Sequence, residues 1–500
     1  MAARASLSKE DISTIINRIQ RLFLEDEIPW VVGYSGGKDS TATLQLVWYA
    51  LAALPEEQRG RKDVYVISTD TGVEQPVVAA WVKQSLDKMR SSAQEKRMPI
   101  IPRRLTPLVT NSYWVNLIGR GYPAPRPTFR WCTSRLKIEP SNRFIKETIK
   151  SYGETVLVLG TRKSESTRRA ANMEIHEKHR IREYLSPNAS LPNSWVFSPI
   201  EDWSNDDVWF YLLQYDNPWG NSNKDLLSMY RGASADNECP LVVDTGTPSC
   251  GSSRFGCWVC TVVMADRSMQ AMIQNDVEKL WMTPLLEFRN EIGLLDSEGR
   301  IDDRGRRDFR RMNGTIKLLK DGRAVPGPYT KKWREHLLRR LLETEREVRR
   351  AAPTELQGMR LIHVEELQQI RRIWVTEKHE FDDAVPRIYE EVTGRRLPPG
   401  EDLGSGPFGE DEWNTLENLC SGNETLVEMV TSVLDIVQRR RGDHSRRSLT
   451  IDLEHVIRRC FFENEDDAVS FELQRQSQLK AGRQSAIEGL EYDDGGIDTE

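Results

Sequence analysis

A short glycine-containing turn between an apolar strand and an apolar helix most constrains how this chain can fold. Residues 30–34 form an apolar run of strand length, which predicts a buried strand. The turn SGGKDS follows at residues 35–40, and an apolar, helix-like stretch occupies residues 41–54. In open α/β sheets, ligands bind in the crevice outside the carboxyl ends of the strands. The turn is therefore the first candidate for a binding site.

The same alternation of strand and helix continues through the first 205 residues. Further strands are predicted at residues 64–68, 100–101 and 156–159. Helical spacing of apolar residues predicts helices at residues 8–24, 77–89, 141–150 and 206–215. Strands that alternate with helices are typical of a parallel, doubly wound α/β sheet. Beyond this region, helical patterns at residues 331–350, 360–377 and 423–440 predict a mainly helical C-terminal region.

The chain divides into four parts by composition. We expect an α/β domain at residues 1–230, a cysteine-rich loop at 231–270, a helical region at 271–475 and an acidic, disordered tail at 476–500. No apolar run approaches the roughly 20 residues that a membrane span needs, and the first ten residues lack a signal-peptide core. We therefore expect a cytoplasmic protein with no membrane partner.

The net charge neither implies nor excludes a nucleic-acid partner. The chain carries 70 basic and 76 acidic residues, a formal charge of −6. Six acids and one base in the last 20 residues account for −5 of this value. The remaining 480 residues are almost neutral on average, although they contain clusters of arginine.

Residues 35–40, here called the phosphate loop, have the chemistry of an anion site. Glycines allow a tight turn, the N–H groups at a helix start bind anions, and Lys38 adds a positive charge. Asp39 is a candidate for holding Mg²⁺ through the phosphates. The spacing differs from the Walker pattern, and a plain turn between strand and helix is the alternative.

The phosphate loop resembles the PP-loop of the N-type ATP pyrophosphatases, a superfamily that includes phosphoadenosine phosphosulfate (PAPS) reductases and tRNA thiolases. Three later segments are similar to motifs of the reductase branch: DTGVE at residues 70–74, GxRxxESxxR at 160–169, and PIxxW with DVWxY at 199–211. The resemblance implies an adenine-nucleotide α-hydrolase-like fold, and transfer of AMP to an oxygen with release of pyrophosphate. It implies ATP binding by Ser35, Gly36, Gly37, Lys38, Asp39, Ser40, Asp70, Thr71 and Gly160. It implies catalytic roles for Lys38, Asp39, Arg162 and Arg169.

Four of the seven cysteines fall within 22 residues, which points to a metal centre. These are Cys239, Cys250, Cys257 and Cys260. Four thiolates suit either zinc or an iron–sulfur cluster, and the spacing does not choose between them. Cys420 and Cys460 lie in apolar, helical settings, so we expect them to be core residues.

Cys132 is a fifth candidate ligand. The segment RWC at residues 130–132, with Lys137 and Pro140, resembles the cysteine-bearing segment of cluster-containing sulfonucleotide reductases, except that Thr133 replaces a second cysteine. The resemblance implies a 4Fe-4S cluster on four of the five cysteines and one cysteine left to carry sulfur as a persulfide. The favoured ligand set is Cys132, Cys250, Cys257 and Cys260, with the set Cys239, Cys250, Cys257 and Cys260 as the alternative.

Residues 239–261 resemble the DndC family, the ATP pyrophosphatases of bacterial DNA phosphorothioation, and the resemblance extends from the N-terminus to about residue 290. It implies ATP-dependent replacement of a non-bridging oxygen of a DNA phosphate by sulfur. The implied partners are DNA, a cysteine desulfurase as the sulfur source and other Dnd-type modification proteins.

Three other functions remain open at this point. A sulfonucleotide (PAPS or APS) reductase is one, although such enzymes use a mobile cysteine near the C-terminus and no cysteine follows Cys460. A non-catalytic ATP-binding protein with a structural zinc is the second, and a tRNA thiolase is the third.

Arginine-rich segments are the candidates for contact with DNA. Three arginine clusters are candidates for it: Arg304, Arg306, Arg307, Arg310 and Arg311; Arg339, Arg340, Arg346, Arg349 and Arg350; and Arg439, Arg440, Arg441, Arg446 and Arg447. Because acids are interleaved with them, solvated helix faces explain these clusters equally well.

Overall fold

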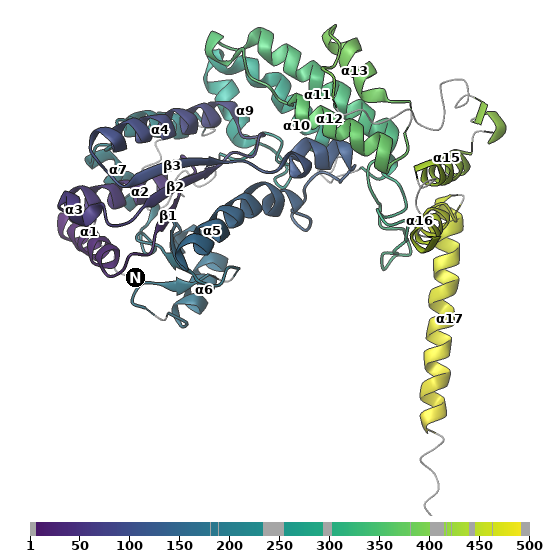
Figure 1. The fold of residues 1–500 in the computed structure, drawn as a ribbon, viewed down its shortest axis with the longest axis horizontal. Helices are drawn as coiled ribbons and strands as arrows, with labels where there is room; N and C mark the ends of the chain where they lie inside the picture. Colours follow the sequence, from purple (N-terminus) through teal and green to yellow (C-terminus); the bar gives the residue numbers. More distant parts are fainter. Residues whose placement is uncertain are drawn as a thin grey trace, which may run out of the picture. The chain divides into compact units, whose positions relative to one another are not determined.

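The structure, a computed structural model, describes two compact units. It describes residues 7–491 except 181, 189, 234–254, 294–302, 381, 401–414, 417, 422, 440–445 and 463. Unit 1 comprises Met1–Tyr113, Pro125–Gly293 and Glu347–Leu361. Unit 2 comprises Trp114–Ala124, Leu294–Arg346 and Ile362–Glu500. Figure 1 shows the elements along the chain.

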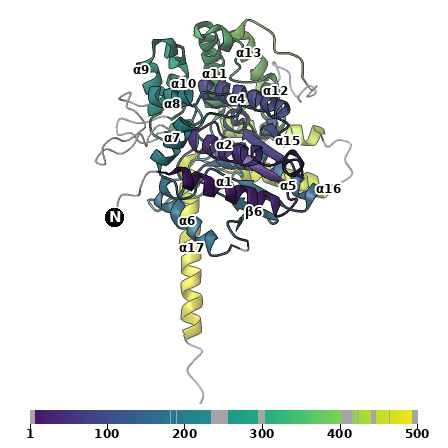
Figure 2. The same ribbon diagram turned by 90° about the vertical axis from the view of Figure 1, so that its left-hand side faces the viewer.

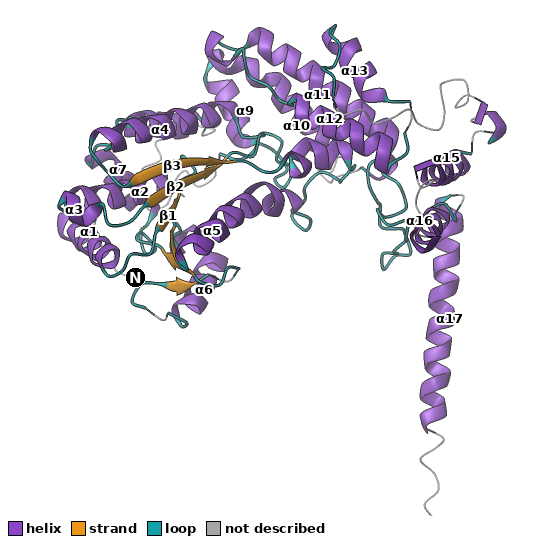
Figure 3. Ribbon diagram, viewed as in Figure 1, coloured by secondary structure: helices purple, strands orange, loops and turns teal. Residues whose placement is uncertain are grey.

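Unit 1 is built on a six-stranded sheet of order β3-β2-β1-β4-β6-β5. The strands are β1 (Trp30–Gly33), β2 (Val64–Thr69), β3 (Ile100–Leu105), β4 (Thr155–Val158), β5 (Ser186–Pro187) and β6 (Ser194–Phe197). All neighbours pair in parallel except β5 and β6, which pair antiparallel (Figure 3). The chain runs outward from β1 to β3 and then returns to the other side of β1, so β1 and β4 flank the switch point. This confirms the predicted doubly wound sheet.

Helices cover both faces of this sheet (Figures 1 and 2). One face packs against α1 (Lys9–Leu24), α2 (Lys38–Ala52), α4 (Pro76–Glu95) and α7 (Asn205–Gln214), in a core that contains Trp30, Trp48 and Trp209. The other face packs against α5 (Glu139–Tyr152) in a smaller core of Val31, Ile67, Ile145 and Leu191. Burial of strand side chains on both faces explains why β1 and β2 are continuous apolar runs.

Local sequence signals predicted the start of α1 and missed two strands. A capping box starts this helix: the Ser8 hydroxyl accepts from the Asp11 N–H at 3.1 Å and the Asp11 carboxylate accepts from the Ser8 N–H at 2.9 Å. Strands β5 and β6 were not predicted. They span only two and four residues, which is too short to show a period.

The remaining helices of unit 1 are α3 (Glu56–Arg59), α6 (Thr167–Glu177), α8 (Asn223–Gly232), α9 (Arg267–Asn275) and α10 (Thr283–Gly293). α10 and the second half of α9 fall in the range 271–475 that the composition assigned to a separate helical region. In the structure they lie in unit 1, because Phe288 of α10 packs on Trp258 and Arg289 bonds the backbone near Cys260.

Unit 2 is mainly helical, as predicted. Its helices are α11 (Lys331–Ala351), α12 (Val364–Arg372), α13 (Ala384–Thr393), α15 (Glu424–Arg439), α16 (Arg446–Arg459) and α17 (Glu465–Glu491), and α11 continues into unit 1. A π-helical turn, Ile373–Glu377, brings the Trp374 indole N–H to the carbonyl of Ile118 at 3.1 Å. No helix among the described residues is long and apolar enough to cross a membrane.

Residues 476–491 differ from the expectation of a disordered tail. The structure continues α17 through Glu491. Three acids in the first turn, Glu465, Asp466 and Asp467, complement the helix dipole and favour helix formation from that end. Residues 492–500 lie outside the described part of the chain.

Trp30 tests the main core of unit 1. It is 1% exposed, and its ring contacts Phe23 of α1 at 5.4 Å and Phe197 of β6 at 6.1 Å between centroids. We expect Trp30→Ala to lower the free energy of unfolding by about 3–5 kcal/mol, measured by chemical denaturation. Trp30→Phe keeps a ring and removes an indole N–H that has no partner, so it should cost much less. Equal losses in the two variants would contradict this account.

Candidate active site at the carboxyl edge of the sheet

The phosphate loop joins β1 to α2 in a conformation that requires glycine. Gly36 has a φ of +76°, and a Cβ atom there would lie 2.5 Å from Cγ2 of Val82. The Ser35 N–H donates to the Ser40 hydroxyl at 3.2 Å, and that hydroxyl donates to the Gly37 carbonyl at 3.0 Å. The N-cap residue, Gly37, has no side chain that could cap the first turn of α2. The start of α2 is therefore shaped to bind an anion.

Asp39 lies between two cations at the start of α2. Its carboxylate accepts from Lys38 Nζ at 2.9 Å and from Arg162 Nε at 2.7 Å. The Arg162 side chain is 4% exposed and also donates to the Ser164 hydroxyl at 2.8 Å and the Trp203 carbonyl at 3.2 Å. Arg162 thus links the loop after β4 to the phosphate loop.

Gly160 allows these two loops to touch. A Cβ atom at Gly160 would lie 2.7 Å from the Asp39 carbonyl oxygen, so the backbones are in direct contact. The structure therefore brings together the phosphate loop, Gly160 and Arg162. Arg169, the other predicted catalytic arginine, lies on α6 and pairs with Glu165. Trp203 and Trp209, the tryptophans of the segment at residues 199–211, are buried.

Two aromatic residues that the sequence did not single out contact the phosphate loop. The Lys38 N–H donates to the Tyr230 hydroxyl at 3.3 Å, and the Trp81 indole N–H donates to the Gly36 carbonyl at 3.2 Å. The Tyr230 ring packs edge-on against Trp209 and Phe255, and burial raises the pKa of Tyr230 above its ordinary value. Tyr230 lies nearly 200 residues after the loop, so no local signal indicated it.

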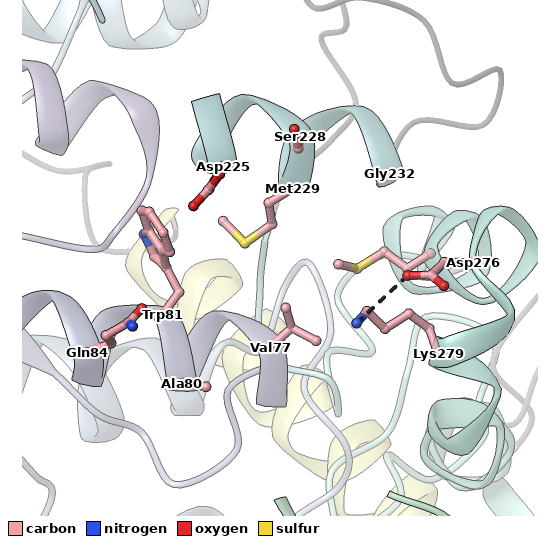
Figure 4. Close-up of a pocket in the computed structure, with 11 residues that line it drawn as sticks. Val77, Ala80, Trp81, Gln84, Asp225, Ser228, Met229, Gly232, Asp276 and Lys279 are labelled. Atoms are coloured by element: carbon pink, nitrogen blue, oxygen red, sulfur yellow. Dashed lines mark ion pairs between the residues drawn. The ribbon is translucent and has the colours of Figure 1, made fainter. Parts of the chain in front are cut away.

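Trp81 also lines a cavity of about 570 Å³ between α4, α8 and the α9 region (Figure 4). Val77, Met229 and Met272 give it apolar walls, and Asp276 and Lys279 form an ion pair at 3.8 Å on one side. The hydrogen bond from Trp81 to Gly36 makes this cavity a neighbour of the phosphate loop.

The loop after β2 connects the phosphate-loop edge to the cysteines. Asp70 pairs with Arg104 and accepts from the Gly72 N–H at 2.8 Å. Thr71 is 1% exposed and its hydroxyl lies 3.6 Å from the Cys257 sulfur. The Trp258 N–H donates to the Val73 carbonyl at 3.0 Å, beside a β-bridge between Glu74 and Cys257. Since β1 and β2 are neighbours in the sheet, the two loops share one edge.

Residues 257–260, here called the cysteine turn, form a closed turn in which the Cys260 N–H donates to the Cys257 carbonyl at 3.0 Å. Burial raises the pKa of Cys257 to about 11. Burial also raises the pKa of Cys132 above its ordinary value. Burial raises the pKa of Glu74 to about 7, against the charge of Lys137.

The described thiols fit a thiolate metal centre in their chemistry. Buried thiols with raised pKa values stay protonated alone, whereas a metal ion stabilises them as thiolates. The Trp131 ring stacks on Tyr113, whose hydroxyl donates to the Val259 carbonyl at 3.4 Å, so Cys132 follows a residue that is held near the cysteine turn. Cys239 and Cys250 lie outside the described residues, and within the described part no three His, Cys, Asp or Glu side chains are close enough to hold a metal ion. The cluster stays a prediction.

Arg289 of α10 fixes the chain after the cysteine turn. It is 1% exposed, donates to the Cys260 carbonyl at 3.0 and 2.8 Å and to the Met264 carbonyl at 2.8 Å, and also bonds the Val263 carbonyl. An arginine within the apolar helical pattern TPLLEFRNEIG was the only sequence signal for this role.

Most described arginines of the clusters at residues 304–311 and 339–350 bond carboxylates or carbonyls of the protein itself. Arg310 is 7% exposed and binds Asp308 and Glu428, both at 2.9 Å. Arg304 binds Glu465 at 3.1 Å, Arg339 pairs with Glu391, and Arg346 donates to the Val392 carbonyl at 3.0 Å. The cluster at residues 439–447 has no described side chains. These described arginines therefore mainly form ion pairs and hydrogen bonds within the chain.

The central part of the chain matches a known family model. Residues 29–262 match the phosphoadenosine phosphosulfate reductase domain. This range contains all six strands, the phosphate loop and the cysteine turn. This part of the chain is therefore similar to the PAPS reductase domain over somewhat less than half of its length.

Two uncharacterized proteins of Methanocaldococcus jannaschii are similar in sequence. One is 28% identical over 267 residues, which are 53% of this chain and 42% of that protein. The other is 27% identical over 210 residues, 42% of each. The chain thus spans less than half the length of these relatives.

Two solved structures are similar over part of the chain. The U34-tRNA thiolase NcsA of Methanococcus maripaludis with its 4Fe-4S cluster matches at a TM-score of 0.27 and 16% identity, over 44% of this chain and 72% of that one. An FMN adenylyltransferase of Candida glabrata, in complex with FMN and an ATP analogue, matches at 0.25 and 14%, over 47% and 66%. At these TM-scores neither structure informs the function of this chain, and the narrower resemblance to the DndC family stays a prediction.

Gly160→Ala tests the contact between the two loops. Its methyl group would collide with the Asp39 carbonyl and displace the start of α2, so we expect ATP affinity to fall at least tenfold in equilibrium binding. Gly358→Ala is the matched control, because a Cβ atom there meets nothing within 4 Å. Unchanged ATP affinity in Gly160→Ala would show that the contact is dispensable.

Arg289→Met tests the support of the cysteine turn. Removing the guanidinium leaves several buried carbonyls without a donor, so we expect a loss of about 3 kcal/mol in the free energy of unfolding and lower metal content per chain. Thermal unfolding and metal analysis measure the two effects. Arg267→Met, at an exposed position of α9, is the control and should change neither quantity.

Proposed function

We propose that this chain is an ATP pyrophosphatase and sulfurtransferase that replaces a non-bridging oxygen of a DNA backbone phosphate with sulfur. One observation carries the proposal: the phosphate loop and the cysteine turn lie at the same sheet edge, joined by residues 70–74. Thr71 contacts Cys257 at 3.6 Å, and β2 pairs directly with the strand that leads into the phosphate loop. Such an edge suits an enzyme that activates a substrate with ATP and delivers sulfur to it.

The first step is activation of the DNA phosphate. ATP binds with its phosphates at the start of α2, where Lys38 offsets the charge that develops on pyrophosphate. Asp39 is the side chain placed to hold Mg²⁺, which would neutralise further phosphate charge. Arg162 keeps the Asp39 carboxylate in position. A DNA phosphate oxygen attacks the α-phosphorus, pyrophosphate leaves, and the DNA phosphate carries AMP as a leaving group.

The second step is displacement of AMP by sulfur. A P–S bond forms at the DNA phosphorus as the bond to the AMP oxygen breaks. When sulfur arrives as a persulfide on the one candidate cysteine that does not bind the cluster, one thiol of a dithiol reductant then attacks the cysteine sulfur, so a mixed disulfide forms and the phosphorothioate is released. The second thiol of the reductant attacks that mixed disulfide and regenerates the cysteine thiol.

A 4Fe-4S cluster would be held by Cys132, Cys257 and Cys260 together with Cys250 or Cys239. When bound, it would keep these sulfurs as thiolates at neutral pH and supply sulfide or electron-transfer chemistry at this edge. The chain's own residues would bind the DNA and exclude water. A cysteine desulfurase and other Dnd-type proteins are the partners that this reaction needs.

Lys38→Ala tests the proposal by its effect on two products. We expect wild-type protein, ATP, a sulfur donor and duplex DNA to release pyrophosphate and form phosphorothioate linkages, detected by mass spectrometry of nuclease digests. Lys38→Ala should reduce both by about 10²-fold, because charge stabilisation at the leaving group is lost. Lys83→Ala, on the exposed face of α4, is the control and should match wild type.

The substrate distinguishes the remaining candidates. Pyrophosphate release with tRNA and not with DNA would instead indicate a tRNA thiolase. Sulfite formation from a sulfonucleotide would indicate a reductase, and zinc content without pyrophosphate release would indicate a non-catalytic nucleotide-binding protein. Each of these results would overturn the proposed function.

A further inference from the structure

We propose that the basic surface formed by β3, the turn at residues 126–130 and α5 is where unit 1 binds DNA, with Phe129 stacking on a base. The inference rests on the proposed function and assigns its DNA-contacting residues. It moves DNA contact from the arginine clusters of unit 2 to the sheet edge that carries the phosphate loop and the cysteine turn.

The charge of this surface is opposite to that of the chain. Residues 100–113 and 125–150 contain nine basic and two acidic residues, a formal charge of +7 in a chain of net charge −6. The basic residues are Arg103, Arg104, Arg126, Arg130, Arg135, Lys137, Arg143, Lys146 and Lys150. Most of them are exposed. A local concentration of positive charge of this size attracts a polyanion.

These segments form one continuous surface beside the site. Arg143 of α5 donates to the Thr106 carbonyl just after β3 at 3.1 Å. Arg135 donates to the Asn111 side chain at 2.7 Å, and the hydroxyls of Ser141 and Thr69 lie 3.1 Å apart at the end of β2. The surface therefore reaches the strand end that carries Asp70 and Thr71.

The turn at residues 126–130 presents an aromatic side chain to solvent. Arg126 and Phe129 exchange two backbone hydrogen bonds, at 3.1 and 2.9 Å, so the turn is closed. At the end of this turn, the Phe129 side chain is 45% exposed and is followed by the exposed Arg130. Aromatic residues in a positively charged groove are the stacking platforms of proteins that bind nucleic acid. A closed turn holds such a ring in place at low entropic cost.

Contacts hold both ends of the turn at residues 126–130, and one of them comes from the residue after the cysteine turn. The Thr261 hydroxyl donates to the Pro125 carbonyl at 2.7 Å, one residue after Cys260. Trp131 is 6% exposed and stacks on Tyr113 with ring centroids 5.3 Å apart. A strand of DNA held by Phe129 and Arg130 would therefore lie close to the sulfur chemistry.

The pairing of the arginines also separates this surface from unit 2. Arg304, Arg310 and Arg339 bind carboxylates within the protein. Among the residues that the structure describes, Arg103 and Arg130 have no carboxylate partner. Cations without an internal partner bind a phosphate without first breaking an ion pair. Charge complementarity thus favours DNA on this surface.

The test compares salt-dependent DNA binding by the full chain and its variants, using fluorescence anisotropy of a labelled duplex. Each of Arg103→Ala and Arg130→Ala should weaken binding and lower the slope of log K against log salt by about 0.9, the value for one lost phosphate contact. Arg90→Ala, an exposed position on α4, is the matched control and should leave the slope unchanged. ATP binding by each variant reports that unit 1 is folded.

Phe129 has its own expected signature. With a labelled single strand in place of the duplex, Phe129→Ala should weaken binding about tenfold with no change in salt slope, because a stacked ring carries no charge. Phe129→Trp should restore the affinity, which a merely structural role for Phe129 would not produce. Ile175→Ala, a similarly exposed apolar position on α6, is the control.

The outcomes separate this surface from the proposed function. If wild-type protein binds and sulfurates DNA while all three variants bind like wild type, the surface is wrong and the function stands. If the protein binds RNA and not DNA, both the surface's assignment to DNA and the proposed function fail. If the protein binds neither RNA nor DNA, the assignment of the surface and the proposed function are both overturned.

Discussion

The contact between the loops after β1 and β4 is the interaction on which the rest of the site depends. Gly160 brings its backbone against Asp39, and Arg162 closes the contact with a nearly buried ion pair at 2.7 Å. Breaking a buried pair by removing one partner typically costs about 3–5 kcal/mol, because the other charge is left without compensation. The position of the start of α2 thus depends on a loop 120 residues further along the chain.

The sequence predicted those features that are encoded locally. Strands β1, β2 and β4, the start of α1 and the glycine turn each follow from the spacing of a few neighbouring residues. Strands β5 and β6 were missed because they form only by pairing with β4 and each other. Tyr230 and Arg289 were missed for a related reason: each acts on residues far away in sequence, through contacts that only the folded chain creates.

Counting charges in the sequence did not show which arginines are available to a ligand. The clusters of unit 2 looked like phosphate-binding surfaces, yet Arg310 and its neighbours hold loops and helices together. The basic residues of β3 and α5 are more dispersed in the sequence and attracted less notice. Arg310 has carboxylate partners, whereas Arg103 of β3 has none among the described residues, and this difference depends on tertiary structure.

The hydrogen bonds from Arg289 also show where the structural domain extends past the family match. The family match ends at residue 262, but the backbone of residues 260–264 is held by a side chain of α10. A fragment that stops at the family boundary would lose this donor and leave the second half of the cysteine turn without its support. The structural domain therefore extends at least to Gly293, about 30 residues beyond the end of the family match.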